Sequence, residues 1–294
     1  MNKITTIVER SYGLAKFLVP GAFLLALFQI PAISPSDSVS QSQSILSRSL
    51  APASVEAGEV VSNRQAALAL TELFFGDEAK LKSTHETVDQ KMNFVSTRKA
   101  YPASLAVIQK HEDTIRAAAK KYGVPEDVAI GVGLLENGGS ETAKSPAGAL
   151  GVFQLMPGTA RSLGLTVNGK IDERRNPAKN IDAGMRYLAL NYYRFGDWGL
   201  ATWAYHAGEG NVSKAVKLYA KANHGINLPG IGNPQPTREY IAKNDITIHK
   251  LLSSPAVKTL TKKLNDDSAG YPYKVIATAT LFKEARQSKE VVTR

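Results

Sequence analysis

Hydrophobic residues recur at helical spacing through the middle of the chain, between residues 105 and 252. Ile181, Met185, Leu188 and Tyr192, for example, follow one another at offsets of 4, 7 and 11 residues. This spacing places the four side chains on one face of an α-helix. No segment in this range alternates apolar and polar residues as a half-buried strand does. We therefore predict a mainly α fold.

Helix-start and helix-stop residues divide this range into separate elements. Gly123 stands where one helix would stop, and Pro125 suits the first position of the next. Glu126 and Asp127 then lie near the positive end of that helix, where acidic side chains are favourable. Further helices are predicted after Pro157, after Pro177, over residues 198–207 and from residue 237 to about residue 252.

The helix that begins near Pro125 ends on a single carboxylate, Glu136. Val128, Val132 and Leu135 form its apolar face, and Glu136 lies at the edge of that face. Burial disfavours the charged form of a carboxyl group, and a carboxyl group that stays protonated can act as a general acid. Glu136 is therefore the first candidate catalytic residue.

The N-terminal segment has the pattern of an export signal. Lys3, Arg10 and Lys16 precede an apolar run that continues through residues 17–33. We predict that residues 1–34 are either a cleaved signal peptide or a retained membrane anchor, and a buried core helix is the third reading. The first two place the rest of the chain outside the cytoplasm, in the periplasm, either soluble or attached to the inner membrane.

The flanking regions are predicted to contain little packed structure. Residues 35–100 are interpreted as a serine-rich linker with one short helix over residues 62–76, which a capping pattern starts and Gly76 stops. Residues 101–252 form the main domain. Residues 253–294 are interpreted as a basic C-terminal extension that is solvated surface, with a membrane-binding or wall-binding tail as the alternative.

Composition narrows the possible chemistry. Lys and Arg total 36 against 26 Asp and Glu, a net charge of +10 that favours anionic partners. The basic residues are spread along the chain rather than interleaved with aromatic residues, which argues against nucleic acid. Without cysteine there is no thiolate nucleophile and no disulfide. His206 and Glu209 lack a third metal ligand, so neither a metal ion nor a cofactor is predicted.

Four ordered motifs make residues 105–252 resemble the catalytic domain of the soluble lytic transglycosylases. These goose-lysozyme-like enzymes cut the glycan of peptidoglycan. The motifs are Ser145-Pro146 and Gln154, nine and eighteen residues after Glu136; an Asn-Pro motif from Asn176 to Leu188; AYHAGEG from Ala204 to Gly210; and Thr-Arg-Glu-Tyr from Thr237 to Tyr240.

The resemblance implies a role for each matching residue. Glu136 would be the catalytic acid and base, and Ser145 and Gln154 would contact the substrate amide and help to orient Glu136. Tyr205 and Tyr240 would flank the sugar or hydrogen-bond the catalytic carboxyl group. Met156 would line the groove, and His206, in place of the family's asparagine, would contact substrate. Read without the motifs, Gln154 is equally a buried amide that ties the loop, Tyr205 a core aromatic residue and Met156 a core side chain.

Three further positions depart from the family pattern. Asn137 stands where the family has serine, Glu209 replaces a residue of the sugar groove, and Pro236 stands where a glutamate usually precedes Thr-Arg. These departures and His206 leave the substrate contacts and specificity open. Activity is less affected, because Glu136 is retained.

No second carboxylate is obviously paired with Glu136, and Glu141 is the nearest candidate. The resemblance implies that the substrate's own 2-acetamido group assists cleavage of the β-1,4 bond between MurNAc and GlcNAc. The sugar's 6-hydroxyl would then close a 1,6-anhydro ring without a cofactor. Two alternatives stay open: hydrolysis by water, and a non-cleaving wall-binding scaffold of an envelope or secretion apparatus. A peptidoglycan glycan strand is the partner in each case.

Overall fold

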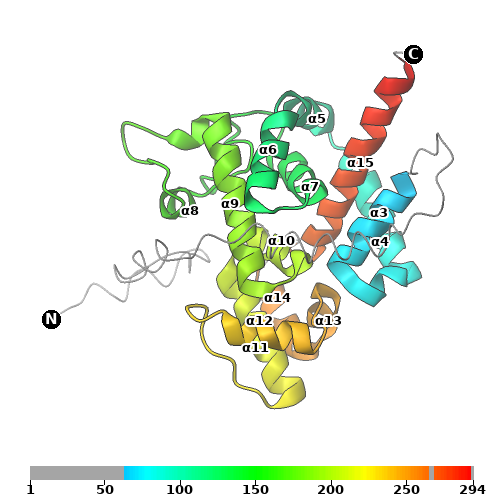
Figure 1. Cartoon of the computed structure of the whole chain (residues 1–294), viewed down its shortest axis with the longest axis vertical. Helices are drawn as coiled ribbons and strands as arrows, with labels where there is room; N and C mark the ends of the chain where they lie inside the picture. Colours follow the sequence, from blue (N-terminus) through cyan, green and yellow to red (C-terminus); the bar gives the residue numbers. More distant parts are fainter. Residues whose placement is uncertain (1–62, 265–267, 293–294) are drawn as a thin grey trace.

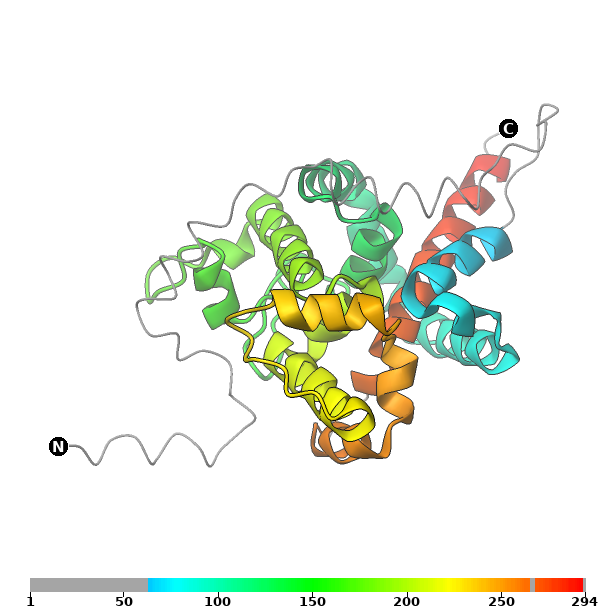
Figure 2. The same cartoon turned by 60° about the horizontal axis from the view of Figure 1, so that its bottom comes forward.

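A computed structural model describes residues 63–264 and 268–292 (Figures 1 and 2). This part of the chain contains helices and isolated bridges but no strand, so the mainly α prediction is confirmed. The predicted N-terminal signal or anchor and the serine-rich stretch lie outside the described residues. The helices are α3 (Asn63–Phe75), α4 (Lys82–Ser96), α5 (Tyr101–Lys110), α6 (Glu112–Tyr122), α7 (Glu126–Glu136), α8 (Pro157–Ser162), α9 (Pro177–Phe195), α10 (Trp198–Ala207), α11 (Glu209–His224), α12 (Gln235–Lys243), α13 (Ile248–Ser253), α14 (Pro255–Lys263) and α15 (Tyr271–Val292), with short 3-10 turns η1 (Gly76–Lys80), η2 (Glu173–Arg175) and η3 (Ser268–Gly270).

Helix α7 lies at the centre of the fold. Every residue from Val128 to Leu134 is buried, so the helix is apolar on all sides rather than on one face. It packs against α5, α6 and α15. The chain enters the helix through Pro125 and leaves it at Asn137, next to Glu136.

Helices α9 and α10 form the second part of the core, and they pack against each other and against α6 and α11. Asn176 caps the start of α9 by accepting a hydrogen bond from the Lys179 amide, at 3.0 Å. Asp197 caps α10 in the same way, through the Leu200 amide at 2.7 Å. These caps satisfy amide groups that a helix start otherwise leaves unpaired.

The polar stretch predicted to be a linker after residue 80 contains helix α4. Val88 and Val95 are buried, and Met92 packs partly against the core between them. The spacing of four and three residues is helical, but three apolar residues among polar ones give a weak pattern. Contact with α15 stabilises this helix, which sequence periodicity alone did not reveal.

The C-terminal extension is likewise part of the core rather than solvated surface. Val275, Ile276, Ala279 and Phe282 of α15 are buried. The helix packs against α7, α4, α3 and α10. Figure 1 shows α3 and α4, near the start of the described chain, lying beside α15 at its end.

The predicted helix over residues 237–252 is two helices, α12 and α13. Asp245 adopts a positive φ of 48° between them, and the Ile246 amide donates back to the Ile241 carbonyl at 3.0 Å. Thr247 then caps α13 by accepting a hydrogen bond from the Lys250 amide, at 3.2 Å. The short helix predicted after Pro157 and the one over residues 198–207 are present as α8 and α10.

None of the described helices is long and apolar enough to cross a bilayer.

Gly131 sets the distance between α7 and α15. A Cβ atom at this position would lie 2.4 Å from the Val275 carbonyl oxygen, and Thr278 already donates to the Gly131 carbonyl at 2.8 Å. We predict that Gly131→Ala lowers the free energy of unfolding by about 1–3 kcal/mol, because the backbone of α15 must move. Denaturant unfolding measures this change.

Gly169→Ala is the matched control, since no atom lies within 4 Å of a Cβ at Gly169. Equal stability of the two variants would contradict the close contact between α7 and α15.

Candidate active site

Three helices converge on the carboxyl group of Glu136, which is half-buried at the end of α7. The Tyr271 hydroxyl, at the start of α15, donates a hydrogen bond to Glu136 Oε1 at 2.7 Å. The Tyr271 ring stacks on the His206 ring of α10, with centroids 4.4 Å apart and planes 11° from parallel. Helix α15, interpreted from the sequence as part of an extension, therefore supplies a direct contact to the candidate catalytic carboxylate.

Buried tyrosines surround this carboxylate. The Tyr205 hydroxyl donates to the Phe153 carbonyl at 2.6 Å. Burial raises the pKa of Tyr271 and of Tyr205, and the charge of Glu136 raises each pKa further. Both phenols therefore stay protonated through the neutral range, and Tyr271 remains a hydrogen-bond donor to Glu136.

Glu209, expected to lie in the sugar groove, pairs with a third tyrosine. The Tyr187 hydroxyl donates to Glu209 Oε2 at 2.7 Å, and the Tyr187 ring lies 5.1 Å from the Tyr205 ring. Burial, followed by the Glu209 charge, raises the pKa of Tyr187. This contact ties the start of α11 to α9.

Asn137, the residue next to Glu136, is a fully buried structural amide. Its Nδ2 donates to the Ser104 carbonyl at 3.1 Å and to the Gly133 carbonyl at 2.9 Å. Its Oδ1 accepts from the Gly139 amide at 2.8 Å. The asparagine therefore fixes the end of α7 to α5 and sets the direction of the loop that follows, which accounts for this departure from the family's serine.

The loop after α7 carries Ser145 and Gln154. Ser145 Oγ accepts from the Ala149 amide at 3.0 Å within a tight turn, which leaves its hydroxyl proton available to another acceptor. Gln154 has a positive φ of 43°, and its Nε2 donates to the Ala143 and Gly151 carbonyls at 2.7 and 2.9 Å. The Gln154 amide thus ties the loop, as expected when the sequence is read without the motifs. Its carbonyl oxygen remains the group available to a ligand.

Two buried polar residues hold this loop from outside. Asn180 of α9 accepts from the Phe153 amide at 2.7 Å and donates to the Leu150 carbonyl at 3.0 Å. Arg174 donates to the Gly148 and Leu155 carbonyls, each at 2.8 Å. The Asn-Pro motif therefore has a physical meaning: Asn176 starts α9, and Asn180 secures the loop.

Two glycines allow helix α9 and this loop to approach each other closely. A Cβ at Gly184 of α9 would lie 2.6 Å from Phe153 Cγ, and a Cβ at Gly151, where φ is +93°, would lie 2.3 Å from Asn180 Nδ2. No side chain fits at either position without displacing the loop.

The remaining predicted residues lie in other elements of the fold. Met156 is half-buried at the start of α8, after the loop that carries Gln154. Tyr240 is buried in α12, and its hydroxyl makes a 2.7 Å hydrogen bond with His224 Nδ1. The Tyr240 hydroxyl is thus engaged by His224, whereas the Tyr271 hydroxyl contacts Glu136. Pro236 lies in the first turn of α12, a position that suits proline.

Glu141, the candidate second carboxylate, is held on the outer side of the loop. Its Oε1 lies 2.5 Å from Lys110 Nζ and 3.1 Å from His111 Nε2. The hydrogen bond from Lys110 holds the pKa of the Glu141 carboxyl below its usual value. Glu141 thus anchors the loop to α5. Among the residues that the structure describes, no three His, Asp or Glu side chains cluster as metal ligands.

Sequence reasoning missed Tyr271, Arg174 and the role of Asn180. Tyr271 lies in a turn-rich segment 135 residues after Glu136, and nothing local indicates its contact with the site. The Asn-Pro motif contained Asn180, so its pattern was the one available signal for a loop-holding residue.

Comparison with known proteins identifies a matching domain in this part of the chain. Residues 113–226 match the family model described as the transglycosylase SLT domain. The match includes Glu136, the Ser145 and Gln154 loop, α9 and α10. Residues 113–226 are therefore similar to the SLT transglycosylase domain.

Individual relatives share limited sequence identity with the chain. The chain is 27% identical over 173 residues to membrane-bound lytic murein transglycosylase D of Escherichia coli, covering 58% of this chain and 38% of the relative. It is 37% identical over 127 residues to a transglycosylase of Enterobacteria phage PRD1, covering 42% of this chain and 45% of the relative. The chain thus spans less than half the length of these two relatives.

A solved structure of lytic transglycosylase Slt from Pseudomonas aeruginosa is 18% identical, with a TM-score of 0.41, and covers 92% of this chain and 38% of that one.

The stability of the loop should depend on Asn180. Asn180→Ala leaves the Phe153 amide and the Leu150 and Arg174 carbonyls without their side-chain partner inside the protein. We expect the free energy of unfolding to fall by about 3 kcal/mol, since each buried polar group without a partner costs about 1–3 kcal/mol. Denaturant unfolding measures the loss, and amide hydrogen exchange at Phe153 locates it.

Asn223→Ala is the control, because Asn223 is exposed and its Nδ2 makes one hydrogen bond, to the Tyr219 carbonyl, within α11. Equal losses in the two variants would show that Asn180 does not hold the loop.

Proposed function

We propose that this protein is a peptidoglycan lytic transglycosylase that cleaves the β-1,4 bond between MurNAc and GlcNAc and forms 1,6-anhydroMurNAc. The observation that carries the proposal is the single carboxylate Glu136, half-buried at the end of an apolar helix and hydrogen-bonded at 2.7 Å by a neutral phenol. The SLT domain match supports the same class of enzyme.

In this proposal, protonated Glu136 donates its proton to the glycosidic oxygen as the bond breaks. Positive charge develops at the anomeric carbon, and the substrate's 2-acetamido oxygen stabilises it. Glu136, now a carboxylate, then accepts the proton of the same sugar's 6-hydroxyl, whose oxygen closes the 1,6-anhydro ring. The attacking oxygen belongs to the reacting sugar, so the step has the advantage of an intramolecular reaction.

The surroundings of the other acidic residues favour this route over direct hydrolysis. Glycosidases that use water or a protein nucleophile pair two carboxyl groups across the bond. Glu141 is bound to Lys110, and Glu209 accepts the hydroxyl of Tyr187. Glu141, the candidate second carboxylate, and Glu209 are thus each engaged by another side chain.

The loop supplies groups that suit the acetamido function of the substrate. The Ser145 hydroxyl can donate a hydrogen bond and Gln154 Oε1 can accept one, so together they match an amide carbonyl and N–H. Asn180 and Arg174 hold the backbone of this loop, which orients both groups before substrate binds. Met156, at the end of the loop, would line the sugar groove.

The aromatic residues complete the proposed substrate site. Tyr205 and His206, at the end of α10, would flank the sugar bound at Glu136. His206 offers a flat ring that stacks on Tyr271, which accounts for a ring in place of the family's asparagine. Tyr240 would contribute farther along the groove, through α12.

We also propose that the enzyme acts outside the cytoplasm, where its substrate lies. The basic and apolar N-terminal pattern supports export, and one relative's name describes a membrane-bound protein. Local opening or remodelling of the wall is the role that fits, with an envelope or secretion apparatus as the partner.

Replacement of the acid tests the proposal directly. Glu136→Gln keeps the shape of the side chain but cannot donate and accept the proton, so solubilisation of purified peptidoglycan should fall by at least about 100-fold. Glu86→Gln, at an exposed position of α4, is the control and should retain activity. Wild-type rates for Glu136→Gln would refute the assignment.

The released products separate the proposed reaction from its alternatives. Mass spectrometry should find muropeptides with 1,6-anhydro ends, which are one water lighter than the reducing ends left by hydrolysis. Reducing ends alone would make the protein a muramidase. Binding to peptidoglycan without any soluble product would make it a scaffold.

Tyr271 should affect turnover more than substrate binding. Tyr271→Phe keeps the ring stack with His206 and removes the hydrogen bond to Glu136. A hydrogen bond to a charged group contributes about 1.5–3 kcal/mol, so kcat should fall about 10-fold to 100-fold while KM changes little. Kinetics on soluble glycan fragments measure both constants.

Tyr193→Phe, on the exposed face of α9, should match the wild type in the same assay. An unchanged kcat for Tyr271→Phe would remove Tyr271 from the positioning of Glu136.

A further inference from the structure

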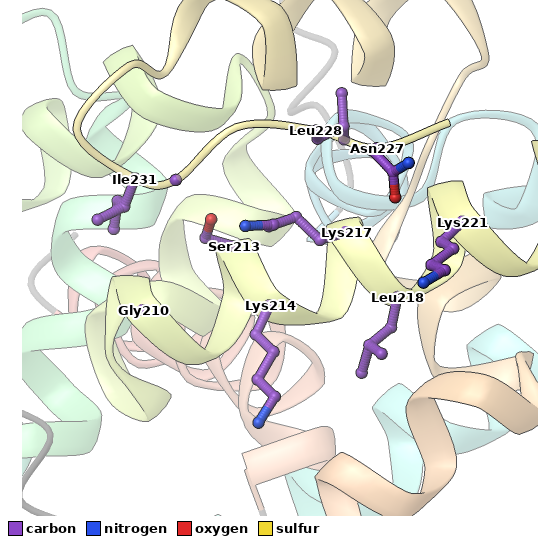
Figure 3. Close-up of a pocket in the computed structure, with 10 residues that line it drawn as sticks. Gly210, Ser213, Lys214, Lys217, Leu218, Lys221, Asn227, Leu228 and Ile231 are labelled. Atoms are coloured by element: carbon purple, nitrogen blue, oxygen red, sulfur yellow. The ribbon is translucent and has the colours of Figure 1, made fainter. Parts of the chain in front are cut away.

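A groove of about 510 Å³ lies between α11 and the loop that joins it to α12 (Figure 3). Lys214, Lys217 and Lys221 line it from the helix, and Leu228 and Ile231 line it from the loop. No acidic residue is among the residues that line it. The groove therefore combines three positive charges with apolar side chains.

The three lysines lie on one face of α11, at spacings of three and four residues. Lys214 and Lys221 are exposed, and Lys217 is half-buried. Within the described part of the chain, none of them has a carboxylate at ion-pair distance. Like charges at these spacings destabilise an isolated helix. The helix thus carries a repulsion that an anionic ligand would relieve.

The walls of the groove are held in place at both ends of the loop. The Ile226 amide donates to the Ala220 carbonyl at 3.2 Å as the chain leaves α11. The hydrogen bond between His224 and Tyr240 then joins the end of α11 to α12. Tyr240 is therefore part of the framework of this groove.

One end of the groove is close in sequence to the candidate active site. Gly210, at one end of the lining, is four residues after His206, and α11 follows α10 with only Gly208 between them. A polymer that extends from Glu136 past His206 and along α11 would reach this groove. The ligand is therefore best sought in the same polymer.

We propose that the groove binds the peptide arms of the peptidoglycan strand through their carboxylates. This inference rests on the proposed function, and it names the part of the substrate that the protein recognises away from the cleaved bond. Peptide arms carry carboxylates, which match the three ammonium groups, and small alkyl side chains, which match Leu228 and Ile231. The residues that line the groove include no aromatic ring on which a nucleic-acid base could stack, so a nucleic acid fits less well.

The test uses the full chain with Glu136→Gln, so that binding is measured without cleavage. The groove variant changes Lys214, Lys217 and Lys221 to Gln. The control variant changes Lys258, Lys262 and Lys263 of α14 to Gln. These lysines are exposed and do not line the groove, so the control removes the same charge. Sedimentation measures affinity for intact peptidoglycan and for glycan strands from which an amidase has removed the peptides.

The groove variant should bind intact peptidoglycan about 10-fold more weakly than the control variant, with a weaker dependence on salt. The two variants should bind bare glycan equally. Equal binding of the two variants to intact peptidoglycan would overturn the proposal, as would an equal loss on both polymers.

A third arm replaces peptidoglycan with vesicles of anionic phospholipid. A groove variant that loses vesicle binding but keeps peptidoglycan binding would also overturn the proposal, in favour of a membrane surface. Thermal unfolding of both variants controls for folding, and neither should be less stable than its parent. Cleavage by the chain with intact Glu136 is scored separately, so failure of the proposed reaction and failure of the groove are distinguishable.

Discussion

The close contact between α7 and α15 determines the surroundings of Glu136. The two backbones approach at Gly131, where a side chain would strike the Val275 carbonyl, and Thr278 bonds to the Gly131 carbonyl. With the helices at this distance, Tyr271 reaches the carboxyl group at the end of α7. A central helix buried on all sides therefore ends in a polar group whose neighbours are supplied by a distant part of the chain. The chemistry proposed for Glu136 depends on this packing as much as on the carboxyl group itself.

A second set of contacts fixes the position of the loop after α7, just as α15 fixes the surroundings of Glu136. Asn137 fixes the exit from α7, while Asn180 and Arg174 bind the backbone of the segment that carries Ser145 and Gln154. All three are buried, and their polar groups are satisfied by backbone carbonyls and amides and, for Arg174, by the Asp172 carboxylate as well. In a low-dielectric interior such bonds are costly to break, so the loop is held in one arrangement. The site is thereby organised before any sugar arrives.

The core helices and the central loop could be predicted from the sequence because their signals are local. The spacing of Ile181, Met185 and Leu188, the glycine and proline boundaries and the motif offsets from Glu136 all lie within short windows. Helices α4 and α15 were not predicted as core elements, because what stabilises them is contact between opposite ends of the described chain. Tyr271 was missed for the same reason, and Asn137 could be understood only once its partners in α5 and α7 were seen.

The position of Tyr271 also bears on the order in which the chain becomes functional. Glu136, the loop, α9 and α10 are all synthesised before α15, and the contact between Tyr271 and Glu136 spans 135 residues. Contacts of such long range form late, because the chain between them must first be ordered. A partly made or partly folded chain would hold its acid without its phenol partner. The last described helix thus makes completion of the fold a condition for the full set of contacts around Glu136, which would limit the proposed activity to the fully folded molecule.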